Sequence, residues 1–185
     1  MRDEMLQRIV FTGGPGSGKS TLIRELIGMG YAVSPESGRA IMQQQMAIEG
    51  HGLPGKNLLL YAELMLARDM QSYLYPQTDS GPVFYDRGIP DTIGYLRTIG
   101  EEVAAHFFQA VRLYRYHRKV FLFPPWVEIY AQDSERKQPF EEAVRTCDAM
   151  ESVYADAGYE VVEVPKAPVM QRVAFVLSEL ARTSE

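Results

Sequence analysis

The chain has 185 residues, enough for one domain with a substantial core, and its 46% hydrophobic and 23% charged residues are ordinary for a globular protein. A formal net charge of −5 argues against the basic surface of a dedicated nucleic-acid-binding protein, so we expect no nucleic-acid partner. The single cysteine, Cys147, excludes an internal disulfide, and no apolar run is long enough for a membrane span or a signal peptide, so we expect a cytoplasmic protein without membrane contact.

Short apolar runs alternate with helical patterns along the chain. In chain order, we expect strand 9–12, helix 20–27, strand 31–33, helices 36–48 and 57–74, strand 82–86, helices 92–99 and 101–116, strand 119–123, helix 139–157, strand 160–164 and helix 168–183. Strands that alternate with helices are typical of a parallel sheet covered on both faces. We therefore predict a three-layer α/β fold in which residues 1–185 form a single domain.

The segment from Gly13 to Ser20 has the spacing G-x-x-x-x-G-K-S between the first strand and the first helix. Glycines let the backbone wrap a polyphosphate, whose charge the inward N–H groups and the helix N-terminus stabilise. We expect Lys19 to reach the β- and γ-phosphates and Ser20 to bind Mg²⁺. The sequence thus predicts ATP and Mg²⁺ as ligands, with a nucleotide site formed by Gly13, Gly14, Pro15, Gly16, Ser17, Gly18, Lys19, Ser20 and Thr21.

An acidic and a basic residue follow the third strand. Asp86 ends the apolar run 83–86, Arg87 comes next, and Asp91 lies in the same turn. At the carboxyl edge of a sheet, such a carboxylate can hold Mg²⁺ through water or accept a proton, and such an arginine can stabilise the transferring phosphoryl group. The alternative is a surface ion pair between Asp86 and Arg87, which would contribute little.

A second polar set is expected across the cleft from the phosphate-binding loop. Glu36 and Arg39 follow the second strand, and Arg68 lies on the long helix that follows it. With Arg87 they predict an acceptor pocket for a molecule that carries a hydroxyl and an anionic or polar group, because guanidinium groups bind carboxylate or phosphate in bidentate fashion. The alternatives are helix-face polarity, and charges that pair with one another.

Other chemistry-bearing residues give weaker signals. The three histidines are scattered without metal-ligand spacing, and we interpret them as structural or surface residues. Cys147 fits a small helix residue better than a nucleophile. Trp126 follows the fourth strand, where it either joins the aromatic core or contacts a planar ligand.

These motifs together resemble a small P-loop ATPase/kinase-like family, often labelled AAA-type, whose relatives include ribosylnicotinamide kinase domains and, more distantly, thymidylate and deoxynucleoside kinases. The resemblance covers nearly the whole chain and implies the strand order 2-3-1-4-5. It also implies a lid at about 130–140 whose Arg136 closes over the phosphates, and a nucleotide base near Pro165. The chain departs from GTPases in lacking N-K-x-D, and from mechanical AAA ATPases in lacking a sensor arginine pattern and a second domain.

Two functions follow as expectations. The first is a phosphotransferase that moves the γ-phosphoryl group of ATP·Mg²⁺ to a hydroxyl of a small molecule, for example a nucleoside-like one. Lys19, Asp86, Arg87 and Arg136 would have catalytic roles, and Ser20 and Asp86 would contact the metal. The alternative is a nucleotide-dependent switch or binding module with slow hydrolysis. Either could act as a monomer or a homodimer.

Overall fold

The computed structural model describes residues 6–130 and 139–182. The elements follow in the order β1 (Gln7–Gly13), α1 (Lys19–Gly28), β2 (Ala32–Ser34), α2 (Ser37–Ala47), α3 (Leu58–Leu74), β3 (Pro82–Asp86), α4 (Ile89–Thr98), α5 (Ala105–Leu113), β4 (Lys119–Phe123), the 3₁₀ turn η1 (Val127–Ile129), α6 (Phe140–Asp156), β5 (Glu160–Glu163) and α7 (Val169–Ala181). No helix among the described residues is both long and apolar enough to cross a bilayer.

The five strands form one sheet of order β2-β3-β1-β4-β5, in which every neighbouring pair is parallel. β1 therefore occupies the centre, with β3 on one side and β4 on the other. This confirms the predicted strand order and the predicted α/β class. The central position of β1 brings the phosphate-binding loop to the middle of the sheet's carboxyl edge, where ligands bind in open α/β sheets.

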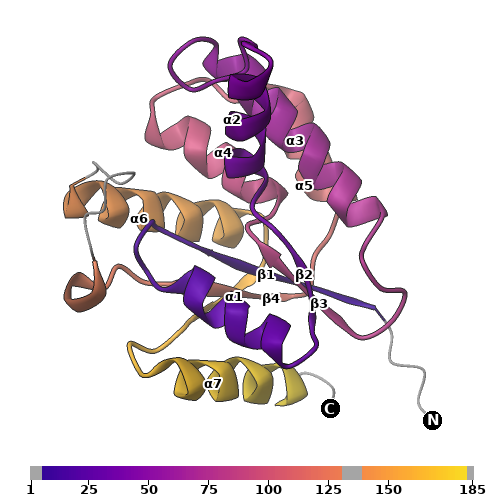
Figure 1. Cartoon of the computed structure of the whole chain (residues 1–185), viewed down its shortest axis with the longest axis vertical. Helices are drawn as coiled ribbons and strands as arrows, with labels where there is room; N and C mark the ends of the chain where they lie inside the picture. The colour runs from indigo at the N-terminus through magenta and orange to yellow at the C-terminus, as the bar shows by residue number, and fades with distance from the viewer. Residues whose placement is uncertain (1–5, 131–138, 183–185) are drawn as a thin grey trace.

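Alternate side chains of the strands face two separate hydrophobic cores. Val10, Val83 and Val120 pack toward the α3–α6 side, whereas Ile9, Phe84 and Phe121 pack toward α1 and α7. Figure 1 shows α1 and α7 together on one face of the sheet and α6 on the other. Each such side chain, when fully buried, contributes about 1.5–3 kcal/mol of hydrophobic free energy to folding. The alternation of these side chains between the two faces of the sheet therefore stabilises a layer of helices on each face.

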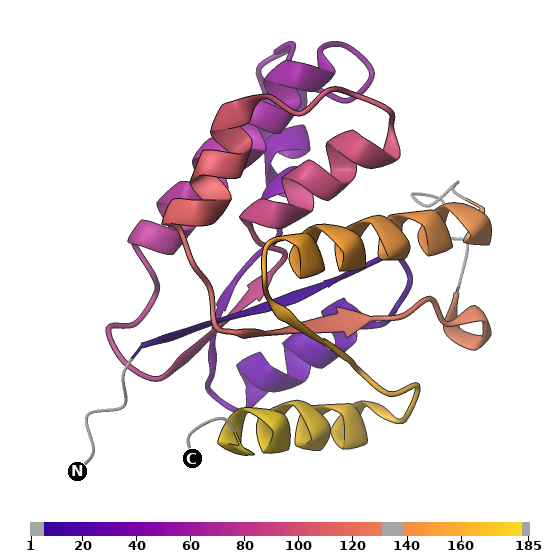
Figure 2. The ribbon, with the colours of Figure 1, turned by 180° about the vertical axis from the view of Figure 1, so that it is seen from behind.

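Four helices gather at one end of the molecule. In Figures 1 and 2, α2, α3, α4 and α5 stand beyond the sheet, and α4 joins them to the rest by packing against α6. These helices follow β2 and β3, so the cleft between them and the phosphate-binding loop lies beside the carboxyl ends of those two strands.

Two of the predicted helices had wrong boundaries. Helix α4 begins at Ile89 rather than at 92, because the Asp91 side chain accepts a hydrogen bond from the Gly88 N–H and caps an earlier turn. Helix α5 spans Ala105–Leu113 rather than 101–116, since the chain leaves it after Leu113 to bury Tyr116 on the way into β4. The remaining elements match the prediction to within two residues at each end.

Candidate active site

The phosphate-binding loop connects β1 directly to α1. Gly18 caps the helix with φ 81° and Gly13 has φ 124°, a region of backbone space that favours glycine. A Cβ on Gly13 would lie 2.3 Å from the Phe123 carbonyl oxygen, so no larger residue fits there. The Ser17 hydroxyl donates to the Gly14 carbonyl at 2.9 Å and holds the loop compact. The local sequence therefore builds an anion-binding helix N-terminus.

The Lys19 side chain is buried within this loop, where it is 7% exposed. Its ammonium group donates to the carbonyl oxygens of Gly13 and Gly14 at 3.2 and 3.0 Å. Burial and the nearby Arg87 guanidinium lower the pKa of Lys19 to about 8, although Asp86 and Glu36 oppose the shift. The amine therefore lies in an environment that favours an added negative charge.

This lowered pKa predicts a pH-dependent affinity for ATP. Polyphosphate favours the protonated amine, so binding above about pH 8 must be accompanied by proton uptake, and the affinity should fall by up to about tenfold per pH unit. Below that pH Lys19 is already charged and the affinity should level off. Calorimetric titrations of ATP·Mg²⁺ from about pH 7.5 to 10 would measure this affinity. In a Lys19→Arg control the affinity should not change with pH over this range. A wild-type affinity that is constant across this range would contradict the prediction.

Asp86 and Arg87 lie where β3 ends beside β1, since Asp86 pairs with Phe11 in the sheet. The Arg87 N–H continues this pairing by donating to the Phe11 carbonyl, and Arg87 has φ 75°. That left-handed conformation is unfavourable for a residue with a Cβ, and such strain is concentrated at functional sites. It turns the Arg87 side chain back toward the loop.

The Asp86 carboxylate has a buried oxygen, Oδ1, with no hydrogen-bond partner among the described residues. Burial raises the pKa of Asp86, against the opposing charges of Lys19 and Arg87. Asp86 and Ser20 both line the cavity over the loop. A free carboxylate oxygen and a hydroxyl fit Mg²⁺, which binds few protein groups and completes its shell with phosphate and water. The described residues contain no cluster of three acidic, histidine or cysteine side chains around a metal position.

Arg87 is held between two carboxylates. Its Nη1 donates to Asp91 Oδ1 at 3.0 Å and its Nε to Glu36 Oε1 at 3.3 Å. Burial alone would lower the pKa of Arg87, but Glu36, Asp91 and Asp86 together outweigh burial and raise it. Burial likewise opposes ionisation of Glu36, yet Arg87, Lys19 and Arg39 hold its pKa below the usual value. Both side chains are therefore charged.

Asp91 fixes this pair to the rest of the fold. Its carboxylate also accepts hydrogen bonds from the Thr12 hydroxyl at 2.6 Å, the Tyr154 hydroxyl at 2.7 Å and the Gly88 N–H at 3.0 Å. β1, α4 and α6 thus meet at one buried carboxylate, which positions Arg87.

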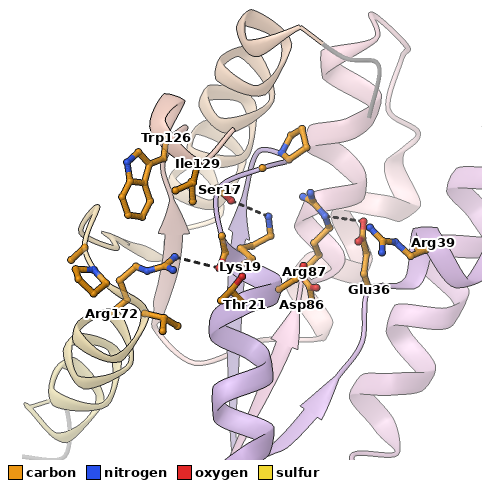
Figure 3. A pocket seen from close by; sticks show the side chains of 17 residues that line it. Ser17, Lys19, Thr21, Glu36, Arg39, Asp86, Arg87, Trp126, Ile129 and Arg172 are labelled. Atoms are coloured by element: carbon orange, nitrogen blue, oxygen red, sulfur yellow. Dashed lines mark hydrogen bonds and ion pairs between the residues drawn. The ribbon is translucent and has the colours of Figure 1, made fainter. Parts of the chain in front are cut away.

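Two cavities meet at Glu36 and Arg87. The first, here named the loop cavity, has a volume of about 560 Å³ and runs over the phosphate-binding loop. The second, here named the side cavity, has a volume of about 300 Å³ and lies among α2, α3, α4 and α6. The residues that line both are Pro15, Glu36 and Arg87. In Figure 3 Glu36, Arg39 and Arg87 lie on one side of Lys19, and Trp126 and Arg172 lie on the other.

Arg172 is a site residue that sequence reasoning missed. It extends from α7 to donate from Nη1 to the Gly18 carbonyl at 3.3 Å, and its guanidinium lies 5.5 Å from the centre of the Trp126 ring. Both side chains line the loop cavity. The available signal was a lone cation on the apolar face that Val169, Val173 and Val176 present. The sequence could not show that this face meets the loop 154 residues earlier.

The structure brings together part of the expected acceptor set. Glu36, Arg39 and Arg87 line the loop cavity, but Arg68 lines neither cavity. The face of α3 toward the side cavity carries Tyr61, Met65 and Asp69, spaced by four residues, and Arg68 is one position off that face. Asp69 occupies the place predicted for Arg68.

The remaining predicted residues are placed as follows. Thr21 and the loop residues Pro15 to Ser20 line the loop cavity, whereas Pro165 lines a small adjoining hollow together with Trp126 and Arg172. Arg136 and most of the expected lid lie outside the described residues. Cys147 is buried in α6, and burial raises the pKa of its thiol to about 11, so it is not a reactive thiolate.

A family model described as AAA domain matches residues 8–172. The chain belongs to the AAA domain family. No curated protein sequence matches it.

Solved structures similar to this AAA domain protein include a thymidylate kinase, a deoxyadenosine kinase and the NadR protein. A thymidylate kinase from Ehrlichia chaffeensis has 17% identity and a TM-score of 0.63, and the alignment covers 95% of this chain and 99% of that one. A deoxyadenosine kinase from M. mycoides has 14% identity and a TM-score of 0.65, with 96% and 100% covered. The NadR protein in complex with NR has 18% identity and a TM-score of 0.66, and the alignment covers 96% of this chain and 51% of NadR. At these identities the likeness establishes the P-loop kinase-like fold.

Proposed function

We propose that this protein transfers the γ-phosphoryl group of ATP to a hydroxyl group of a small, nucleoside-like molecule. The observation that carries the proposal is the pair of cavities joined at Glu36 and Arg87. A donor over the phosphate-binding loop and an acceptor in the side cavity would meet at these two charged groups. The kinase folds of the similar structures support the same reading, whereas hydrolysis alone requires no second cavity.

Holding the donor is the task of the loop. Lys19 and the loop N–H groups bind the phosphates, while the Ser20 hydroxyl and Asp86 hold Mg²⁺, directly or through water. The metal supplies charge neutralisation of the phosphates when bound. Arg172 and Trp126, at the far side of the loop cavity, provide a flat cationic and aromatic surface for the base. We also assign to Arg136 the role expected from the sequence, which is to close over the phosphates.

The transfer itself is assigned to Glu36 and Arg87. An acceptor hydroxyl oxygen forms a bond to the γ-phosphorus while the bond from that phosphorus to the β–γ bridging oxygen breaks. The hydroxyl proton passes to the Glu36 carboxylate, which is ionised and lines both cavities. Arg87 stabilises the charge on the transferring group, and ADP leaves. Of the two roles first considered for Asp86, its geometry favours the metal contact over the proton acceptor.

Acceptor-stimulated ADP formation tests this function. In a screen of nucleosides, at least one should accelerate ADP formation, and Glu36→Gln should reduce that acceleration by about 10²–10⁴-fold with ATP affinity retained. Asp86→Asn should instead raise the Mg²⁺ concentration that half-saturates the reaction. The exposed Glu102→Gln variant serves as the control and should match the wild type.

Two outcomes would contradict the proposal. Full transfer activity in Glu36→Gln would remove Glu36 from the reaction. Tight ATP binding without stimulation by any acceptor would favour the nucleotide-dependent switch.

A further inference from the structure

The side cavity has a wall of aromatic and thioether side chains. Tyr61 of α3 and Tyr95 of α4 meet edge to face, with ring centroids 5.9 Å apart. The thioethers of Met42, Met65 and Met150 line the same space, and methionine adapts its shape to planar ligands. At about 300 Å³ the cavity is at the small end of ligand pockets, which span roughly 300–1,000 Å³. It suits a compact molecule with one ring.

The charges around this wall are predominantly negative. Glu36, Asp69, Asp91 and Glu142 line the side cavity, and Arg87 is the sole lysine or arginine that lines it among the described residues. Arg87 is already bonded to Glu36 and Asp91, at 3.3 and 3.0 Å. Asp69 accepts a hydrogen bond from the neutral Ser37 hydroxyl. One guanidinium thus serves Glu36 and Asp91, whereas Asp69 pairs with no guanidinium that lines the cavity.

We propose, on the basis of the phosphotransferase function above, that the side cavity selects a hydroxylated ring compound without negative charge as the acceptor. Its affinity should be highest for cationic compounds, lower for uncharged ones and lowest for anionic ones. Asp69 is the residue that determines this specificity. Its carboxylate would accept a hydrogen bond from a hydroxyl, amide or ammonium group of the acceptor while the ring lies against Tyr61 and Tyr95. The order is opposite to the one that an arginine-lined pocket would give.

The negative potential of the side cavity depends on pH, because the charge of Asp69 changes near neutral pH. Burial raises its pKa to about 7, Ser37 opposes this shift, and Asp91 and Glu36 add to it while Arg68 opposes it. The other titratable or charged side chains around Asp69 are Tyr61, Arg87, Tyr95 and Tyr116. The tyrosines have raised pKa values, so none of them loses its proton near neutral pH. Asp69 is therefore the group whose charge changes there.

Three nucleosides that differ in charge at one position make the test. 5-Aminomethyluridine is cationic, 5-hydroxymethyluridine is uncharged and 5-carboxyuridine is anionic, and all three keep the same ribose hydroxyls. Their affinities for the full-length protein, measured by calorimetry with a non-hydrolysable ATP analogue bound, should decrease in that order. We expect a spread of about tenfold or more between the cationic and anionic members.

Variants of two acidic side chains on α3 separate Asp69 from general electrostatics. Asp69→Asn keeps the shape and the Ser37 contact, and it should shrink the spread severalfold while ATP affinity stays constant. Glu63→Gln, on the face of α3 that contacts His106, should leave the spread unchanged. In the wild type the preference for the cationic nucleoside should grow as the pH rises through about 7, because Asp69 ionises, and this growth should be absent in Asp69→Asn.

The outcomes distinguish this inference from the proposed function. Binding or phosphorylation of 5-carboxyuridine as good as that of the other two would overturn the charge selection and leave the phosphotransferase intact. No binding of any of the three would overturn the assignment of a ring-bearing acceptor. Binding in the expected order without phosphorylation or ADP formation would support the selection and contradict the transfer.

Discussion

A Lys19→Met variant should lose about 10²–10³-fold in phosphoryl transfer, because it removes a preorganised cation from the charge that develops on the phosphates. The fold should persist. Lys19 is buried and desolvation already disfavours its charged form, so an apolar side chain of similar length is tolerated at that position. Single-turnover transfer to an active acceptor, with unfolding by urea as the check on the fold, measures both quantities.

Lys56→Met is the matched control, since Lys56 is an exposed lysine that donates to the Gly50 carbonyl outside both cavities. Its transfer rate should equal that of the wild type. If Lys19→Met and Lys56→Met transferred at the same rate, the phosphate-binding loop would not be the donor site.

Asp91→Asn should reduce the free energy of unfolding by about 3–5 kcal/mol, the usual effect of breaking a buried ion pair. The amide retains some hydrogen bonds, but it lacks the negative charge that pairs with Arg87. It also places an N–H₂ group opposite the donors Thr12 and Tyr154. Arg87 would lose its position, so transfer should fall as well. Equilibrium urea unfolding gives the stability, and the slope m should stay constant if the denatured state is unchanged.

Asp156→Asn provides a comparison at the protein surface. Asp156 pairs with Arg97 at 3.0 Å, the same distance as the pair of Asp91 and Arg87, but its side chain is 61% exposed. Exposed pairs contribute about 0–1 kcal/mol. Equal losses of stability in the two variants would show that Asp91 does not stabilise the packing of β1, α4 and α6 as a buried charge.

The architecture was predictable because it depends on patterns within short segments. Continuous apolar runs such as 119–123 specify strands locally, and the phosphate-binding motif specifies a loop. Parallel strands also need the helices between them. Helix α5 was harder, because its ends depend on where Tyr116 is buried in the folded chain.

The site was predictable only where its residues follow strands directly. Glu36, Asp86 and Arg87 come straight after β2 or end β3, so the sheet alone places them at one edge. Arg68 and Asp69 are adjacent on α3, and which of them faces the side cavity depends on the rotation of a helix that packs against α2 and α4. That rotation reverses the expected charge of the pocket, and no periodicity in the polar residues reveals it.

The position of Trp126 gives the protein a built-in optical reporter. It is the sole tryptophan of the chain, and its indole lines the loop cavity beside Arg172. The emission excited at the red edge of the absorption band therefore comes from one ring at the edge of the nucleotide site. Water and a neighbouring purine quench indole differently, so donor occupancy can be followed on the unlabelled protein, and stopped-flow records of this emission would time the arrival of the donor.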